Sequence, residues 1–262
     1  MKISFSFHLL VYWNNSNVLV TTVCKKAKKN NFVCSDHINK INKLTNLDTH
    51  LKIIWTNTTF CENSSIGGPS TDTCHFLKDL DVTLDPDTAE NNLILSADGK
   101  QVRHVDTPQN LPDNPKRFDP VVNVLGKQGF TSGRFYYEVE VSGKTAWDLG
   151  VARESINRKG RITLSPENGH WTIWLRNGDE YEAHAGPSIL LSLKEKPERV
   201  GVFVDYEAGL VSFYDADRWN LIYSFRGVSF KEKIFPFFTP CPNYGGKNSS
   251  PLIIITPITS PK

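Results

Sequence analysis

VGVFVDYEAGLVSFY, residues 200–214, predicts two strands joined by a tight turn. The apolar runs 200–204 and 210–214 lie on either side of Glu207-Ala208-Gly209, and a short segment that ends in glycine suits a hairpin because glycine adopts positive φ without strain. Each run is long enough for one strand and too short for a typical helix. The stretch therefore predicts a β-hairpin near the end of the chain.

Two further hairpins are marked by the dipeptides Asp98-Gly99 and Asn177-Gly178, which follow the apolar runs 93–95 and 171–175. Asp-Gly and Asn-Gly accept positive φ at both central positions of a type I′ turn, whose twist matches the strands that it joins. Hairpins this regular, without long helical stretches between them, are typical of an all-β protein built as a β-sandwich.

Composition divides the chain near residue 70. Residues 1–75 contain eight Lys, no Arg, ten Asn and four of the five Cys, whereas residues 76–262 contain ten Arg and 24 acidic residues. The stretch 64–70, SSIGGPS, is rich in turn formers and suits a linker. We expect an N-terminal segment, 1–75, with little stable structure, and a folded domain, 76–262, that begins between about 72 and 80.

Charge and apolar patterning exclude some functions. The net charge of +2 is too small for the dense basic face of a nucleic-acid-binding protein, and no apolar stretch reaches the 18 residues that a membrane-spanning helix needs. Residues 3–13 have the length of a signal-peptide core but lack a clean cleavage site. We expect a cytoplasmic protein, with secretion as the minority alternative; the glycosylation pattern at Asn248 and three earlier sites matters only in that case.

No catalytic or metal-binding constellation is present in the sequence. The four N-terminal cysteines lie ten or more residues apart without a Cys-x-x-Cys pair, which argues against a zinc site. Cys241 has no base nearby in sequence and is expected to be a small buried hydrophobe. Glu138 and Glu140 alternate with apolar residues and are expected on the solvated face of a strand. We expect no cofactor, no metal and no enzymatic activity.

A family resemblance emerges from motifs that follow one another in order. They are LDPDTA at 84–89, LILS at 93–96, GRFYYEVEV at 133–141, WDLGVA at 147–152, WTIW at 171–174, VFVDYEAG at 202–209 and FPFF at 235–238. Together they resemble the PRY-SPRY (B30.2) domain, found in tripartite-motif E3 ubiquitin ligases, butyrophilins and fish NLR-type proteins, over roughly residues 78–258. Tyr137 and Val204 stand where the family signatures have Trp and Leu, and both changes keep a core residue apolar.

The resemblance implies a bent sandwich of two antiparallel sheets that binds a protein through variable loops at one end. Carried over by motif position, the ligand-binding candidates are Asp148, Trp174, Arg176, Asn243 and Tyr244, with Arg103 and His104 as weaker additions. The partner's identity stays open, and so does the oligomeric state, although we expect the domain to be monomeric.

The tryptophans of the folded domain are expected in different environments. Trp171 and Trp174 are three residues apart on one strand and must face opposite ways, so that one lies in the core and the other on the surface. Trp147 and Trp219 are expected in the core.

The resemblance leaves two alternatives to a recognition module in innate immunity or ubiquitin-ligase substrate selection. One is a ubiquitin ligase whose RING and B-box region is missing from this chain. The other is a secreted or membrane-associated SPRY protein.

Overall fold

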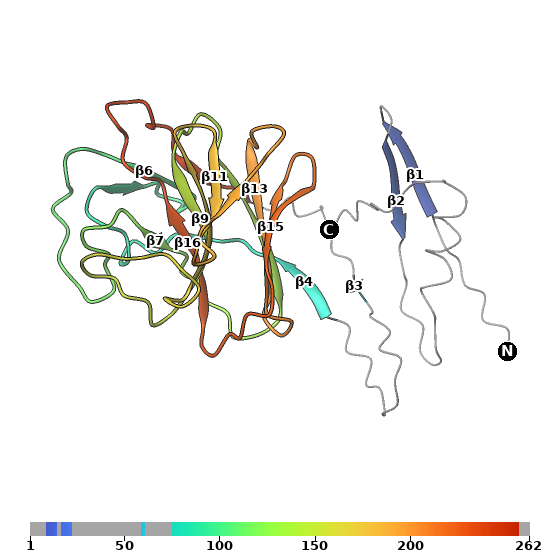
Figure 1. Ribbon diagram of the computed structural model, residues 1–262, viewed down its shortest axis with the longest axis horizontal. Coiled ribbons are helices and arrows are strands. Elements are labelled where there is room, and N and C mark those ends of the chain that lie inside the picture. The colour runs from blue at the N-terminus through green and yellow to red at the C-terminus, as the bar shows by residue number, and fades with distance from the viewer. Residues whose placement is uncertain (1–8, 15–16, 23–58, 61–74, 257–262) are drawn as a thin grey trace. The chain divides into compact units, whose positions relative to one another are not determined.

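The computed structural model describes residues 9–14, 17–22, 59–60 and 75–256 of the chain, which divides into two units, Met1–His75 and Phe76–Lys262 (Figure 1). In the first unit, strands β1 (Leu9–Asn14) and β2 (Asn17–Thr22) pair antiparallel, and β3 (Thr59–Phe60) is short. The expectation that 1–75 has little structure falls largely outside the described residues, so this expectation and the domain boundary stay predictions.

The second unit is built from two sheets, and the described residues contain no helix. The first sheet has the strand order β12-β11-β10-β9-β16-β7. Its strands are β7 (Val124–Leu125), β9 (Trp147–Arg153), β10 (His170–Arg176), β11 (Glu180–Ala183), β12 (Ile189–Leu191) and β16 (Ile234–Thr239).

The second sheet has the order β15-β14-β13-β8-β17-β6-β5, and β4, which is off this path, runs parallel to the first residues of β8. Its strands are β4 (His75–Asp79), β5 (Leu93–Leu95), β6 (Gln101–His104), β8 (Arg134–Glu140), β13 (Arg199–Asp205), β14 (Leu210–Asp215), β15 (Asn220–Phe225) and β17 (Leu252–Ile254).

The three predicted hairpins are present. Asp98-Gly99 joins β5 to β6, Asn177-Gly178 joins β10 to β11, and Gly209 ends the turn between β13 and β14. Asn177 and Gly178 both have positive φ, 54° and 88°, as a type I′ turn requires. Local turn chemistry therefore sets where the strands reverse.

The main core lies between the two sheets. Along β8, Phe135, Tyr137 and Val139 are buried while the residues between them are partly exposed, which confirms the alternation expected for 135–141. The Tyr137 hydroxyl reaches across the sandwich and donates a 2.6 Å hydrogen bond to the Gly150 carbonyl on β9, so its polar atom is satisfied. The two-sheet antiparallel β-sandwich predicted from the sequence is confirmed.

A second apolar cluster lies on the outer face of the first sheet. It consists of Phe118, Leu125, Ala152, Ile156 and Phe237. Phe238, the next residue along β16, belongs to the main core, and neighbouring residues of a strand face opposite ways, so this cluster lies on the side away from that core. The loops that carry Phe118 and Ile156 thus cover part of the outer face.

The expectation for the tryptophans is right for Trp147 and wrong for Trp219. Trp147 is fully buried, whereas Trp219 is only partly buried and stacks on Tyr136 with ring centroids 5.9 Å apart. Tyr136 points away from the core, because it alternates with Phe135 and Tyr137 on β8. Trp219, in the turn between β14 and β15 with φ of 55°, covers that outward face.

His170 makes the fold sensitive to acid. Its ring is buried edge-on against Phe237, with centroids 5.3 Å apart, and burial lowers the pKa of His170 to about 4, assisted by the charge of Arg153. The folded protein keeps the ring neutral where the unfolded chain, with a pKa near 6.5, binds a proton, so stability is lost as the pH falls between these values.

We expect His170 to reduce the free energy of unfolding by about 2 kcal/mol between pH 7 and pH 5. Urea unfolding of the wild type and His170→Gln across this range measures the effect, because all other groups titrate in both proteins. Parallel pH profiles would contradict the prediction.

Candidate functional site

Beyond the second apolar cluster, the first sheet's outer face carries a row of side chains from neighbouring strands. Thr239 on β16 and Trp174 on β10 are both register partners of Asp148 on β9, so the three side chains lie next to one another on the same face. Arg176 follows Trp174 by two residues and shares that face. Strand order therefore brings three of the predicted site residues together.

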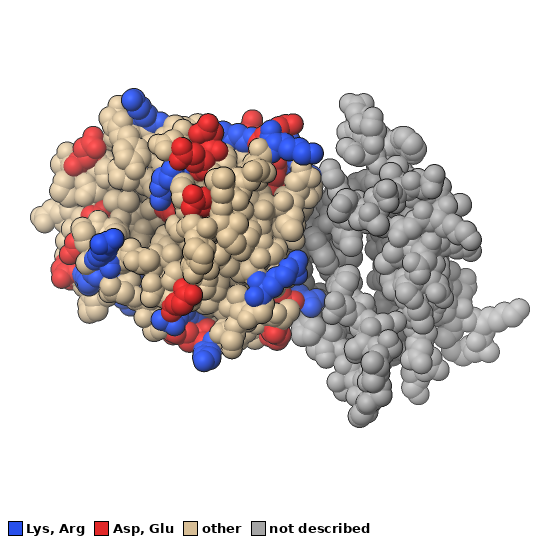
Figure 2. All heavy atoms as spheres, viewed as in Figure 1, with Lys and Arg blue, Asp and Glu red and all other residues tan. Residues whose placement is uncertain are grey.

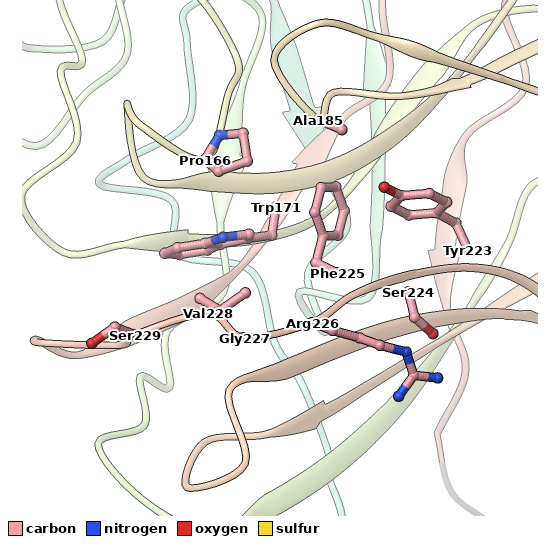
Figure 3. Close-up of a pocket in the computed structure, with 10 residues that line it drawn as sticks. All are labelled: Pro166, Trp171, Ala185, Tyr223, Ser224, Phe225, Arg226, Gly227, Val228 and Ser229. Atoms are coloured by element: carbon pink, nitrogen blue, oxygen red, sulfur yellow. The ribbon is translucent and has the colours of Figure 1, made fainter.

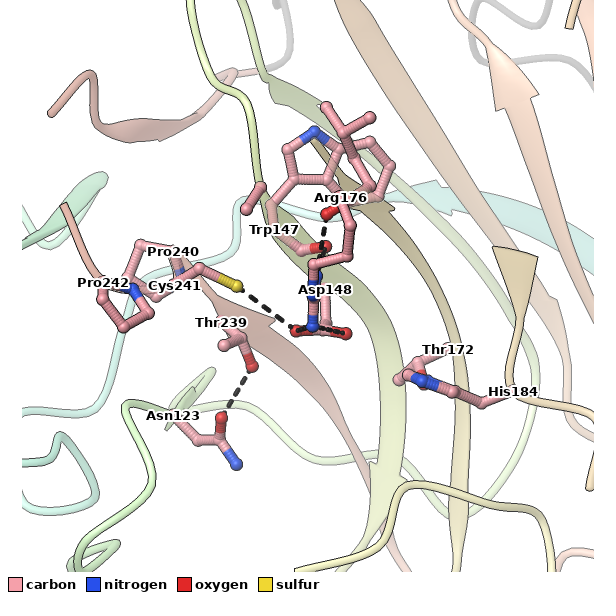
Figure 4. Close-up of polar contacts among 12 residues, drawn as sticks. Asn123, Trp147, Asp148, Thr172, Arg176, His184, Thr239, Pro240, Cys241 and Pro242 are labelled. Atoms are coloured by element: carbon pink, nitrogen blue, oxygen red, sulfur yellow. Dashed lines mark hydrogen bonds and ion pairs between the residues drawn. The ribbon is translucent and has the colours of Figure 1, made fainter. Parts of the chain in front are cut away.

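Asp148 and Arg176 form an ion pair (Figure 4). The Arg176 Nη2 donates to both carboxylate oxygens of Asp148, at 3.0 and 2.9 Å, and Nη1 donates to the carbonyls of Trp147 and Leu175. The Asp148 side chain is only 3% exposed and that of Arg176 is 33% exposed. Arg176 thus stands between the carboxylate and solvent, and Asp148 acts by holding the guanidinium in place.

The charge of this pair alters the pKa of its members. Burial acts to lower the pKa of Arg176, but the charge and hydrogen bond of Asp148, together with smaller contributions from Cys241 and Tyr244, raise the value above the ordinary one. The Cys241 thiol donates to Asp148 Oδ2 at 3.6 Å, and burial raises the pKa of Cys241, so the thiol stays protonated. This agrees with the expectation that Cys241 is not a nucleophile.

Trp174 faces outward and Trp171 faces inward, as their spacing on one strand requires. Trp171 is 7% exposed and belongs to the main core, whereas Trp174 is partly exposed. The Arg176 guanidinium lies 5.0 Å from the centroid of the Trp174 ring, a cation–π contact, and the His184 ring lies 6.1 Å from it on another side. Trp174 therefore presents a partly exposed aromatic surface that contacts both the Arg176 guanidinium and the His184 ring.

The loop after β16 supplies the remaining candidates. Asn243 donates through its backbone N–H to His104 Nδ1 and through Nδ2 to Asp106, and its Oδ1 accepts from Gly245. Tyr244 is 53% exposed and has positive φ, 49°. Burial raises the pKa of Tyr244 while the Arg176 charge acts to lower it, which places these two residues within electrostatic reach of each other.

Asn248 and Lys144 anchor this loop. The buried Asn248 amide accepts from the backbone N–H groups of Thr145 and Ala146 and donates to the carbonyls of Pro240 and Pro242. The buried Lys144 ammonium donates to the carbonyl of Ser250 at 2.9 Å, and burial lowers its pKa to about 8. Because its amide is fully used, Asn248 is a poor glycan acceptor in the folded protein.

The structure thus groups the predicted residues unevenly. Asp148, Trp174 and Arg176 are in direct contact, Tyr244 lies near Arg176, and Asn243 shapes the loop by bridging to His104. Arg103 is exposed and points to the opposite side of β6 from His104. We call the surface formed by Trp174, Arg176 and Tyr244 the candidate face.

Sequence reasoning missed the supporting roles of three residues. These are His184, Asn248 and Cys241, whose thiol donates a hydrogen bond to Asp148. His184 contacts Thr172 through a 2.9 Å hydrogen bond between Nδ1 and Oγ1, beside Trp174. The alternation of β10 could have placed Thr172 and Trp174 on one face, but no local pattern shows that His184 lies against them. The candidate face offers an aromatic surface and polar groups for contact, without an acid–base pair for chemistry.

A separate groove lies towards the other end of β10 (Figure 3). Its volume is about 390 Å³, and Trp171 and Phe225 contribute aromatic rings to its wall. The lining residues are Pro166, Trp171, Ala185, Tyr223, Ser224, Phe225, Arg226, Gly227, Val228 and Ser229. Trp171 is the second residue of β10 and Arg176 the last, so the groove is distinct from the candidate face.

Charged side chains of both signs are interspersed over the face of the second unit shown in Figure 2, separated by uncharged surface. That face carries no extended patch of one sign of the kind that nucleic acids require. No helix among the described residues is long and apolar enough to cross a membrane.

Comparison with known proteins agrees with this architecture. Residues 82–130 match the model of the SPRY-associated domain, PRY, and residues 134–252 match that of the SPRY domain. Nuclear factor 7, brain, of Xenopus laevis is 53% identical over 169 residues, which are 64% of this chain and 28% of that protein. The E3 ubiquitin-protein ligase TRIM21 of Mus musculus is 51% identical over 172 residues, which are 65% of this chain and 36% of the ligase.

The chain therefore spans about a third of the length of these curated relatives. The crystal structure of the TRIM65 PSpry domain superimposes with a TM-score of 0.57 at 23% identity, covering 67% of this chain and 90% of that structure, a likeness that shows the fold. Two family models in the expected order, relatives at about half identity and the shared sandwich agree: residues 82–252 are a PRY-SPRY (B30.2) domain, and the chain belongs to the SPRY domain family.

Proposed function

We propose that the domain is a protein-recognition module and that its partner docks on the candidate face. The observation that carries the proposal is the partly exposed aromatic and guanidinium surface of Trp174, Arg176 and Tyr244, in which Asp148 holds the guanidinium in place. Trp, Tyr and Arg dominate the energetic centres of protein interfaces, and preorganised side chains lose little entropy on binding.

Backbone strain supports the same surface. Among the described residues, four non-glycine residues have positive φ; two of them, Cys241 and Tyr244, lie in the loop after β16, and a third, Asn177, follows Arg176 directly. Such conformations cost about 1 kcal/mol or more each and cluster at functional sites. A strained tyrosine that is half exposed contributes little to the core, so its side chain is better explained by contact with a partner.

The wider role follows from the relatives. We propose that the domain selects a target for a ubiquitin-ligase-type or innate-immune protein in the cytoplasm. The similarity to a protein named as an E3 ubiquitin-protein ligase supports this proposal. PRY and SPRY are binding domains, so ligase activity would depend on a RING elsewhere in a longer protein. One observation supports the secreted or membrane-associated alternative: the human relative named erythroid membrane-associated protein is 51% identical over 173 residues.

Truncation of Trp174 tests the proposed contact. We expect Trp174→Ala to weaken binding of the partner by about 2 kcal/mol, roughly a thirtyfold increase in Kd, because the aromatic anchor is lost. The unfolding midpoint should change little, since the ring lies on the outer face. A pull-down with the full chain identifies the partner by mass spectrometry, and calorimetric titration of each variant then measures Kd.

The matched control for this experiment is Leu221→Lys, which alters an exposed side chain on β15, in the other sheet. It should bind as the wild type does. Full affinity in a folded Trp174→Ala, Tyr244→Ala double variant would place the binding site elsewhere, and a large loss of stability in Trp174→Ala would show that the ring is structural.

A further inference from the structure

The four sheet edges of the second unit differ in how they are protected. The first sheet ends in β7 and β12, and the second in β5 and β15. A free edge exposes unpaired backbone N–H and C=O groups, and proteins usually cover it, bend it or place charges on it, because it otherwise pairs with another chain. Each edge can be assessed by this criterion.

Three edges carry such protection. Both residues of β7, Val124 and Leu125, are fully buried. The β5 edge is followed by a strap, in which Gln109 donates through its backbone N–H to the Asn91 carbonyl and through its side chain to the Leu93 carbonyl. Strand β15 pairs with β14 through a register shift at Phe213/Tyr214, and such a bulge increases the local twist of an edge.

Strand β12 lacks these devices. Its pairing with β11 is continuous from Ala183–Ile189 to Tyr181–Leu191, without a register shift, and among the described residues no strand pairs with its other side. All three residues are apolar, and Ile189 and Leu190 are 43% and 70% exposed. An exposed apolar edge with regular pairing on its other side is a template for pairing with a further strand.

The sequence around β12 indicates which strand pairs with it. Residues 188–192 are SILLS, which is nearly the same in both directions. If two copies pair antiparallel about Leu190, each Leu190 faces the other copy's Leu190, Ile189 faces Leu191, and Ser188 faces Ser192. Every apolar side chain then meets an apolar one, and a twofold contact of this kind closes at two copies.

We propose that two copies of this protein associate through antiparallel pairing of their β12 strands. This departs from the expectation of a monomeric domain and goes beyond the binding function proposed above. The twofold axis stands perpendicular to the joined sheet, so both candidate faces lie on the same side. Five strand spacings separate the two β10 strands, which is about 24 Å. The dimer therefore presents two Trp174 surfaces to one partner and gains avidity for a repeated or symmetric target.

Sedimentation equilibrium of the full chain tests the proposal, in reducing buffer so that cysteines do not cross-link. Between about 1 µM and about 200 µM, the weight-average mass should rise from that of one chain towards that of two, because a short strand makes a small, weak interface. Leu190→Lys should raise the dissociation constant at least about tenfold, since it places like charges at the twofold axis. Leu221→Lys, a change to the exposed leucine of the bulged β15 edge, should leave the constant unchanged.

Hydrogen exchange locates the contact. The Leu190 N–H faces the free edge, because the flanking residues Ile189 and Leu191 pair with β11. The Leu190 amide should therefore gain protection as the concentration of the wild type rises, and the amide at position 190 should not gain it in Leu190→Lys. A wild type that stays monomeric at about 200 µM would overturn the proposal and leave this edge to a different protein. Equal loss of association in both lysine variants, open-ended oligomers, or a dimer without added protection at the Leu190 amide would overturn it as well.

Discussion

Gly150→Ala is expected to destabilise the domain by more than about 4 kcal/mol, enough to unfold many proteins of marginal stability. Gly150 lies in the middle of β9 between β10 and β16, with φ of 153°. A Cβ atom there would stand 2.1 Å from the Trp171 carbonyl oxygen and 2.9 Å from the Thr172 Cα, both backbone atoms of a central strand. Relief of the clash would separate β9 from β10.

The same substitution at Gly133 provides the control. Gly133 has φ of 84°, and no atom lies within 4 Å of a Cβ built there, so Gly133→Ala carries backbone strain without a clash. We expect it to cost about 1 kcal/mol. Guanidinium unfolding of both variants measures the difference. Equal costs would show that β9 relaxes around the new methyl group and that the close approach is not essential.

Arg176→Met is expected to destabilise the domain by about 3 kcal/mol, because it leaves the Asp148 carboxylate buried without its cation. Within the described part of the chain, only the Cys241 thiol would still donate a side-chain hydrogen bond to Asp148. The carbonyls of Trp147 and Leu175 would lose a donor at the same time. The partly exposed guanidinium keeps the expected cost at the lower end of values for buried pairs.

A double-mutant cycle measures the interaction energy between Asp148 and Arg176 separately from their other contacts. The double variant Asp148→Asn, Arg176→Met should lose about 2 kcal/mol less stability than the two single variants lose together. The reason is that both charges are removed, so that neither a carboxylate nor a guanidinium is left buried without its partner. The control is the exposed pair Lys159–Asp113, with side chains 42% and 82% exposed, where Lys159→Met should cost no more than about 0.5 kcal/mol. Additive changes at Asp148 and Arg176 would show that the ion pair does not hold the site together.

Much of the fold could be predicted from local sequence. Hairpin turns at Asp98-Gly99 and Asn177-Gly178 depend on the backbone freedom of two adjacent residues, and the alternation of 135–141 depends only on the geometry of one strand. Trp219 was misplaced because its partner, Tyr136, lies more than 80 residues away, and no local pattern distinguishes an aromatic residue that covers an outer face from one in the core.

The candidate site divides in the same way. Sequence by itself determined that the chain contains a β-sandwich and that Trp171 and Trp174 face opposite sides, because hairpin turns and strand alternation are properties of neighbouring residues. The SPRY type was indicated by the resemblance of its ordered motifs. Only the tertiary structure decided that Asp148 lies buried beneath Arg176, that Asn243 bridges to His104, and that β12 is an open apolar edge. These features depend on which strands become neighbours and in what register, and pairing between distant segments is set by the packing of the whole core.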